Sequence, residues 1–147
     1  MHIRKAQLSD LARLVEHNQM MAQETEDRTL DHDTLKAGLQ AVLHDPNKGF
    51  YLVAEDNGAV IANLMITFEW SDWRNGQMWW FQSVFVRPEA RGQGVFARMY
   101  AHVLDMAKAE GVKELRLYVE KTNVRAQEVY RRLGMEASHY DMWEVEV

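Results

Sequence analysis

The sequence predicts one mixed α/β domain, residues 1–147, built on a central and mostly antiparallel sheet. Its length, with 47% hydrophobic and 27% charged residues, is typical of a single globular domain. Apolar residues recur with a period of two in some segments and at helical spacing in others, which distinguishes strands from helices. The predicted order is β-α-α-β-β-β-α-β-α-β, and three consecutive strands joined by tight turns favour antiparallel pairing.

The N-terminal third predicts one strand and two helices. Residues 1–6 alternate as a short strand does. Ser9 or Asp10 is suited to cap the first helix, because a short polar side chain accepts a hydrogen bond from a free backbone N–H group. Residues 23–31 are polar and acidic and predict a loop, and residues 33–44 predict a second helix.

The middle of the chain predicts a three-stranded meander. We expect its strands over residues 50–55, 60–70 and 77–86. The dipeptides Asn57-Gly58 and Asn75-Gly76 separate them, and both residue types tolerate the positive φ that a tight hairpin turn requires.

The C-terminal third begins with an amphipathic helix over residues 93–110. A strand over residues 114–120 follows. Thr122-Asn123 is expected to cap a last helix, which Gly134 ends. Residues 139–147 alternate and predict a closing strand.

The connection between the third meander strand and the next helix is a candidate anion site. It reads Arg91-Gly92-Gln93-Gly94 and opens a helix soon after a strand and a proline. Helix N-termini carry free N–H groups and partial positive charge, and glycines let an anion approach the backbone. The stretch lacks the third glycine of the dinucleotide fingerprint and the Gly-Lys-Ser/Thr of the nucleotide phosphate loop. Taken alone, it fits either a phosphate site or a tight strand-to-helix connection.

The composition argues against several classes of function. The absence of cysteine excludes disulfides, thiolate metal sites and a cysteine nucleophile. The six histidines show no metal-ligand spacing on one element, so we expect no metal. A net charge of −5 argues against a general nucleic-acid binder. No apolar run approaches the ~18 residues of a membrane span, and no signal-peptide core follows the N-terminus. We therefore expect a cytoplasmic protein with neither nucleic-acid nor membrane partners.

Two motifs in the second half of the chain carry a family resemblance. The first, Gln/Arg-x-x-Gly-x-Gly/Ala, maps onto Arg91, Gly94 and Phe96, with a bulky ring at Phe96 where a small residue is usual. The second, Asn-x-x-Ala-x-x-x-Tyr-x-x-x-Gly, is intact as Asn123, Ala126, Tyr130 and Gly134. Together they resemble the GNAT superfamily of acetyl-CoA-dependent N-acetyltransferases. The resemblance covers nearly the whole chain and implies about six to seven strands flanked by about four helices.

The resemblance implies that acetyl-CoA is the co-substrate and that a primary amine attacks its thioester directly in a ternary complex. The pyrophosphate would lie on the N–H groups of Arg91, Gly92, Gln93, Gly94, Val95 and Phe96. The pantetheine arm would lie along Val84, Phe85 and Val86 as an added strand does. Asn123, with Ala126 on the same helix face, would hold the arm from the other side. A strand N–H near Phe85 would donate to the developing oxyanion, and Tyr130 would protonate the departing thiolate.

The general base and the acceptor site are less defined by the sequence. Many relatives place a glutamate on the strand before the phosphate loop, whereas Gln82 stands in that neighbourhood here. Gln82 cannot deprotonate an ammonium, but it can orient the acceptor or a water molecule. Glu69 is the candidate base, acting through water, and an exposed carboxylate at a strand end is the alternative. An acidic and aromatic pocket would attract a cationic amine, and its predicted residues are Glu24, Trp70, Asp72, Trp73 and Gln82.

Several functions stay open at this point. The leading one is acetylation of a small cationic amine, and a protein or peptide amine is the alternative acceptor. Phe96 and Gln82 also fit a non-catalytic acyl-CoA-binding sensor, and an interaction module with a vestigial cleft is the third possibility. The alternating residues 140–147 are suited to pair across a homodimer.

Overall fold

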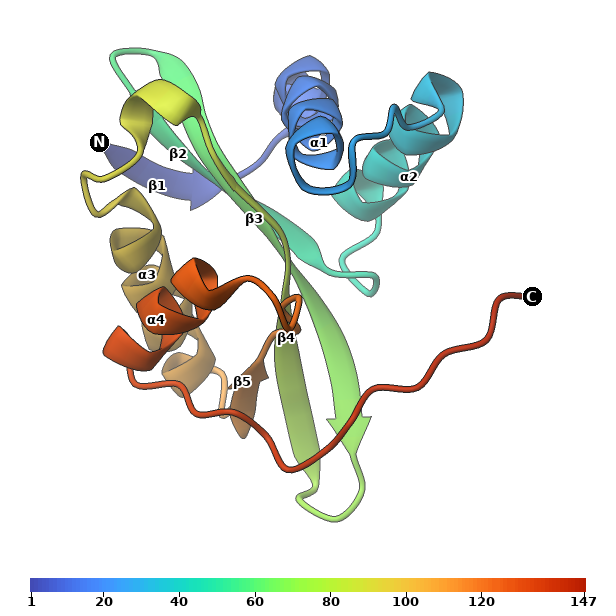
Figure 1. Ribbon diagram of the computed structural model, residues 1–147, viewed down its shortest axis with the longest axis vertical. Coiled ribbons are helices and arrows are strands. Elements are labelled where there is room, and N and C mark those ends of the chain that lie inside the picture. The colour runs from blue at the N-terminus through green and yellow to red at the C-terminus, as the bar shows by residue number, and fades with distance from the viewer. The chain divides into compact units, whose positions relative to one another are not determined.

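The computed structural model describes every residue, Met1–Val147, and the chain divides into two compact units, Met1–Leu117 and Tyr118–Val147. The first unit contains the sheet and three helices, and the second contains the last helix (Figure 1). The prediction that residues 1–147 form one domain stays a prediction.

The first unit follows the predicted order of elements. In chain order these are β1 (His2–Lys5), the 3-10 helix η1 (Leu8–Asp10), α1 (Leu11–Glu26), α2 (His32–His44), β2 (Phe50–Asp56), β3 (Ala59–Ser71), β4 (Gly76–Val86), the 3-10 helix η2 (Pro88–Ala90), α3 (Val95–Ala109) and β5 (Glu114–Arg116).

Its five strands form one sheet in the order β1-β2-β3-β4-β5, antiparallel except for the parallel pair β4–β5. Figure 1 shows α1 and α2 on one side of the sheet and α3 on the other. The side chains packed between α1, α2 and the sheet include Leu14, Val15, Leu39, Val42, Tyr51, Val53 and Val60. This confirms the predicted mixed α/β class with a mostly antiparallel sheet.

The strand count is five, fewer than the six to seven that the resemblance implied. Residues 139–147 form no strand and are exposed, and β5 stops at Arg116 rather than at residue 120. A strand persists only where a neighbour satisfies its backbone N–H and C=O groups. Alternation indicates which residues would share a face of a strand, but it carries no information about a partner strand.

Two local expectations for the first helix need correction. Residues 23–26 belong to α1 rather than to a loop, and the helix ends where Asp27 takes a left-handed φ of 49°. Polar residues such as glutamate and glutamine are good helix formers when exposed, so polarity alone did not indicate a loop. Asp10 is the N-cap residue as predicted, but its carboxylate accepts from the N–H of Gln7 and pairs with Arg4.

The second unit contains α4 (Val124–Arg132), which begins and ends as predicted. Asn123 is the N-cap, and its Oδ1 accepts from the N–H of Ala126 at 3.1 Å. Gly134, with a φ of 97°, follows the helix.

Both predicted hairpin turns of the first unit are also confirmed, since Asn57 and Asn75 adopt positive φ values of 51° and 48°.

Candidate functional site

The loop that opens α3 has the backbone geometry of an anion site. Gly92 and Gly94 have φ values of 76° and 74°, a region that residues with a Cβ rarely adopt. A Cβ built on either glycine would meet nothing within 4 Å, so the space beside both is open. The N–H groups of Gly92, Gln93, Gly94 and Val95 donate to no other atom of the protein. They stand at the positive end of a fifteen-residue helix, which favours a bound anion.

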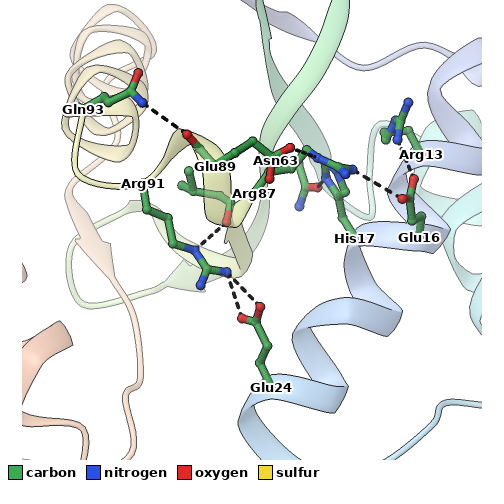
Figure 2. A network of polar contacts seen from close by, with 10 residues as sticks. Arg13, Glu16, His17, Glu24, Asn63, Arg87, Glu89, Arg91 and Gln93 are labelled. Atoms are coloured by element: carbon green, nitrogen blue, oxygen red, sulfur yellow. Dashed lines mark hydrogen bonds and ion pairs between the residues drawn. The ribbon is translucent and has the colours of Figure 1, made fainter.

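Arg91 is held on the edge of this loop by three contacts (Figure 2). Its Nε donates to the carbonyl of Val86 at 2.8 Å, and its Nη2 reaches both carboxylate oxygens of Glu24, at 3.1 and 2.8 Å. Its guanidinium also lies over the ring of Phe85, 5.6 Å from the centroid. Glu24 lies on the last turns of α1. Its carboxylate therefore offsets part of the positive charge of Arg91, which the sequence analysis assigned to attracting an anion.

The C-terminal half of β4 offers an open backbone edge within the first unit. β5 pairs with β4 only at Met78–Trp80, so residues 81–86 have no strand on that side. Val86 lies opposite Ala62, and the next N–H, of Arg87, donates to the carbonyl of Ile61. In an antiparallel pair this arrangement turns the N–H and C=O of Val86 away from β3. An extended ligand can add to such an edge as another strand would.

A β-bulge interrupts β4 within this open segment. Asn63 pairs with Phe85 and Met65 pairs with Gln82, so one residue of β3 faces two of β4. Ser83 lies in the bulge with a φ of 49°, a left-handed conformation that is unusual for a residue with a Cβ.

A buried polar network contacts the bulge from the α1 side. Asn63 donates from Nδ2 to the carbonyl of Ser83 at 2.9 Å, and its Oδ1 lies 2.7 Å from Nδ1 of His17. His17 is 0% exposed and Asn63 is 1% exposed. Nε2 of His17 is 3.4 Å from Nη1 of Arg87, which also pairs with Glu16 (Figure 2). Burial lowers the pKa of His17, which keeps the ring neutral near pH 7.

Tyr51 and Asn18 complete the support of the bulge. The hydroxyl of Tyr51 is hydrogen-bonded to the side chain of Ser83, and Nδ2 of Asn18 lies 3.4 Å from the same hydroxyl. Tyr51 is 3% exposed, and burial raises the pKa of its phenol, so it stays protonated.

Phe96, the departure from the family pattern, packs in an aromatic group between α3 and β4. Its ring centroid lies 6.2 Å from that of Phe81, in an edge-to-face arrangement, and 6.3 Å from that of Tyr100. Phe81 and Tyr100 are themselves stacked at 5.7 Å. The large side chain therefore fills space against the sheet, while the N–H groups of the loop stay available.

The acceptor and base residues predicted on β3 and its hairpin lie at the other end of β4. Trp70 pairs with Gln77, and Trp73, 92% exposed, lies in the turn that precedes β4 together with Asp72. Gln77 and Phe85 are about 26 Å apart along the strand at about 3.3 Å per residue. Glu24 of α1 lies near the opposite end of β4, because it is bonded to Arg91, which is itself bonded to Val86. The structure therefore does not bring Glu24 together with the hairpin residues.

Glu69 is engaged by two donors. Its carboxylate accepts from Nε1 of Trp80 at 3.1 Å and pairs with Arg116 at 3.1 Å. It lies opposite Met78, and Ser83 follows Met78 by about 17 Å along the strand. Gln82, the residue before the bulge, reaches Oγ1 of Thr67 at 3.4 Å.

In the second unit, the family motif lies on one helix. Asn123, Ala126 and Tyr130 are spaced three and four apart, which places them on one face of α4 and its cap. The side-chain oxygen of Asn123 is already used to cap the helix. Burial raises the pKa of Tyr130, so its hydroxyl keeps the proton that it would donate.

Sequence reasoning missed His17, Asn63 and Ser83. Two of them had a detectable signal, because His17 continues the apolar stripe of α1 and Asn63 stands on a strand between apolar neighbours. A polar side chain at a core position is buried only where it has a hydrogen-bond partner, so each of the two residues predicts a buried partner. The left-handed Ser83 had no such signal, since a serine is ordinary in a strand sequence.

Comparison with known proteins identifies the class of enzyme and the family. Residues 11–135 match the model of the acetyltransferase (GNAT) family. The chain belongs to this family, which confirms the resemblance read from the two motifs and the predicted class of enzyme.

Among curated proteins, the chain is 30% identical to the uncharacterized N-acetyltransferase YhfO of Bacillus subtilis (strain 168), over 92% of this chain and 90% of that one. It is 34% identical to the thialysine N-epsilon-acetyltransferase of Bos taurus over 51% of this chain. The chain spans only 44% of the length of that bovine protein.

Among solved structures, a possible acetyltransferase from Clostridium difficile 630 matches with a TM-score of 0.94 and 41% identity, over 99% of this chain and 97% of that one. A predicted acetyltransferase from Clostridium acetobutylicum, solved with acetyl-CoA, shares the fold at a TM-score of 0.80 and 22% identity, over 99% of this chain and 95% of that one.

The structure contains neither a membrane-spanning helix nor a cluster of metal-binding side chains. None of the helices combines the length and the apolar character required to cross a membrane. No group of three or more His, Asp or Glu side chains is arranged to hold a metal ion.

Proposed function

We propose that this chain transfers the acetyl group of acetyl-CoA to a primary amine by direct attack in a ternary complex. The observation that carries the proposal is the set of unpartnered N–H groups from Gly92 to Val95, placed directly after the open edge of β4. Family membership and the acetyl-CoA complex of the fold relative from Clostridium acetobutylicum support the same co-substrate.

In this proposal each segment has one role. The pyrophosphate binds the N–H groups of residues 92–96, since that of Arg91 donates to the carbonyl of Pro88 at 3.3 Å. The pantetheine arm adds to the edge of β4 along residues 84–86. Asn123 and Ala126, in the second unit, keep the role of contacting the arm that the family resemblance implies. The neutral amine attacks the thioester carbon, the carbonyl oxygen becomes an oxyanion near Phe85, and the C–S bond then breaks. Tyr130 donates its proton to the departing thiolate, and the proton that the attacking nitrogen loses returns the phenolate to its neutral form.

We propose a small cationic amine as the acceptor. The bovine relative is named for the acetylation of the ε-nitrogen of thialysine, which supports an amine acceptor. Glu24 at the loop is one carboxylate that can attract a cation, and the predicted acceptor residues Trp70, Asp72, Trp73 and Gln82 keep that status as predictions. A protein or peptide amine is the alternative acceptor.

The co-substrate site is tested by thermal stabilisation with CoA and acetyl-CoA. The wild-type chain is expected to gain stability that rises with ligand concentration. Gly94→Val, which forces a β-branched residue into the left-handed region, is expected to abolish this gain. Gly111→Val is the matched control, because Gly111 has a φ of 70° and follows the C-terminal end of α3, at the other end of this helix from the loop. Equal stabilisation of the Gly94→Val variant and the wild type would place the anion site elsewhere.

The reaction is tested by thiol release from acetyl-CoA over a panel of amines. The proposal expects CoA thiol to appear in proportion to an added primary amine. Stabilisation by CoA without amine-dependent thiol release would instead identify the acyl-CoA-binding sensor that Phe96 and Gln82 suggested.

A further inference from the structure

We infer that His17 and Asn63 are positioning residues, which hold the β4 bulge in the conformation that presents backbone N–H groups to the thioester. This inference rests on the proposed acetyl transfer and names the side chains that prepare its donors. It starts from a geometric fact: a buried side chain of β3 is bonded to the carbonyl of the left-handed residue of β4.

Asn63 has its orientation fixed by its two partners. A carbonyl oxygen can only accept, so the nitrogen of the amide must face Ser83 and the oxygen must face His17. Both contacts are short, at 2.9 and 2.7 Å, and the side chain is 1% exposed. The Nδ2 of Asn63 therefore satisfies the Ser83 carbonyl from inside the protein core.

His17 is fixed in turn. Since Oδ1 of Asn63 accepts, Nδ1 of His17 carries the hydrogen, and Nε2 is the acceptor that faces Nη1 of Arg87. The ring also packs against Phe85, with centroids 4.8 Å apart. One helix side chain thus contacts both sides of the bulge: Ser83 through Asn63, and Phe85 directly.

The bulge determines which N–H groups face the open edge. Along a strand the N–H direction alternates, so one inserted residue reverses the direction of every N–H beyond it. With the bulge in place, Val86 points its N–H away from β3, and Val84, two residues earlier, lies in the same phase. Without the bulge, the same register slip would turn these groups toward β3 and would move Phe85 to the other face.

Ser83 needs this support because it is not glycine. A residue with a Cβ disfavours positive φ, and an ordinary paired strand is the competing conformation. Three contacts oppose that change: Asn63 on its carbonyl, Tyr51 on its hydroxyl, and the His17 ring on the neighbouring Phe85.

The test separates the thioester donors from the phosphate loop. Asn63→Leu removes the donor to Ser83 with a side chain of similar size. We expect kcat for amine-dependent thiol release to fall at least tenfold, while the Kd for ADP, which carries a pyrophosphate but no pantetheine arm, stays within about threefold of wild type. Val42→Ala is the control for lost core stability, because Val42 packs between α2 and the sheet outside the network, and its kcat should match wild type.

A second pair of variants tests His17 and keeps the inference falsifiable if Asn63→Leu does not fold. His17→Asn places an amide N–H near the position of Nδ1, whereas His17→Leu offers no donor. We expect kcat of His17→Asn to exceed that of His17→Leu at equal ADP affinity, and a crystal structure of His17→Leu to show Ser83 outside the left-handed region. Equal, wild-type kcat in both His17 variants would overturn the inference. A wild-type chain that binds no CoA would instead overturn the proposed function.

Discussion

One nitrogen of Arg91, Nη2, contacts both carboxylate oxygens of Glu24, at 2.8 and 3.1 Å, and so joins the last turns of α1 to the loop that opens α3. The two residues are 67 positions apart in the chain. Both are about half exposed, so their attraction is screened by solvent. The pair places a negative charge next to the proposed site of a pyrophosphate, where it opposes anion binding.

Removing that carboxylate should tighten the binding of CoA. For Glu24→Gln we expect a Kd lower by about two- to fivefold, in line with the 0.2–1 kcal/mol typical of an exposed pair. Arg91→Gln should shift the Kd in the opposite direction, because it leaves the carboxylate without its partner. Calorimetry at two salt concentrations measures both, and the differences should shrink at high salt. A weaker affinity for CoA in Glu24→Gln would mean that Glu24 supports the loop through Arg91 rather than opposing the ligand.

Tyr130 should contribute to turnover more than to co-substrate affinity. Tyr130→Phe removes only the hydroxyl, so the Kd for acetyl-CoA should change by less than about threefold, while kcat should fall about tenfold or more. Burial raises the pKa of Tyr130, so the phenol is protonated throughout the neutral range. The wild-type kcat should therefore show no decline from loss of this proton below about pH 10, the usual pKa of tyrosine. A wild-type kcat retained in Tyr130→Phe would remove the tyrosine from the chemistry.

Whether Glu69 is the general base can be tested directly. The sequence predicted it as a base acting through water, whereas its carboxylate is bonded to Trp80 and Arg116, about 17 Å along the strand from the bulge. If the amine attacks beside Phe85, Glu69→Gln should leave kcat within about twofold of wild type at every pH. A tenfold loss, with disappearance of a basic group from the pH profile of kcat, would establish Glu69 as the base.

The elements of the first unit were predictable from local patterns, because each one has a signal that survives in isolation. Asn57-Gly58 fixes a hairpin turn, and Gly94 at the start of α3 requires a positive φ that a glycine provides. The bulge was not predictable, since Ser83 takes its φ of 49° from contacts with Asn63 and Tyr51, which come from other strands. Long-range contacts of this kind leave no local pattern.

The same limit explains the acceptor site. The aromatic and acidic character of Trp70, Asp72 and Trp73 predicts an acceptor pocket, and the family resemblance adds Glu24 to it. A thirteen-residue β3 paired along its length with β4 instead carries the hairpin to the end opposite Glu24. Strand length, rather than residue type, decides which side chains meet.

His17 should make stability depend on pH. Burial is the main cause of its lowered pKa, and Arg87 and Arg13 act in the same direction, against Asn63 and Glu16. The unfolded chain then binds a proton near the usual pKa of 6.5 that the folded chain resists. This contribution is therefore complete above about pH 6.5 and is lost as the pH falls below it.

The melting temperature measured between pH 7.5 and 5.5 checks this sign. Wild type should lose more stability over that range than His17→Asn, which has no titrating ring. His2→Asn, a change at an exposed position of β1, is the matched control and should follow wild type. Parallel curves for wild type and His17→Asn would show that His17 does not titrate differently on folding.

The segment from Tyr140 to Val147 should pair with a second copy of the chain. Trp143 is 91% exposed and Val145 is 87% exposed, and in an extended strand both would lie on one face together with Val147. Such a face, with unpaired backbone groups, is a template for strand pairing. Light scattering at about 50 μM is expected to give wild type the molar mass of a dimer. The double variant that combines Trp143→Ser with Val145→Ser is expected to have the molar mass of a monomer. Glu144→Ser, on the opposite face of the same strand, is the control and should stay dimeric. A monomeric wild type would show that residues 140–147 do not pair between copies. A double variant that still dimerises would show that the contact lies elsewhere, because the two changes remove the apolar face on which the pairing depends.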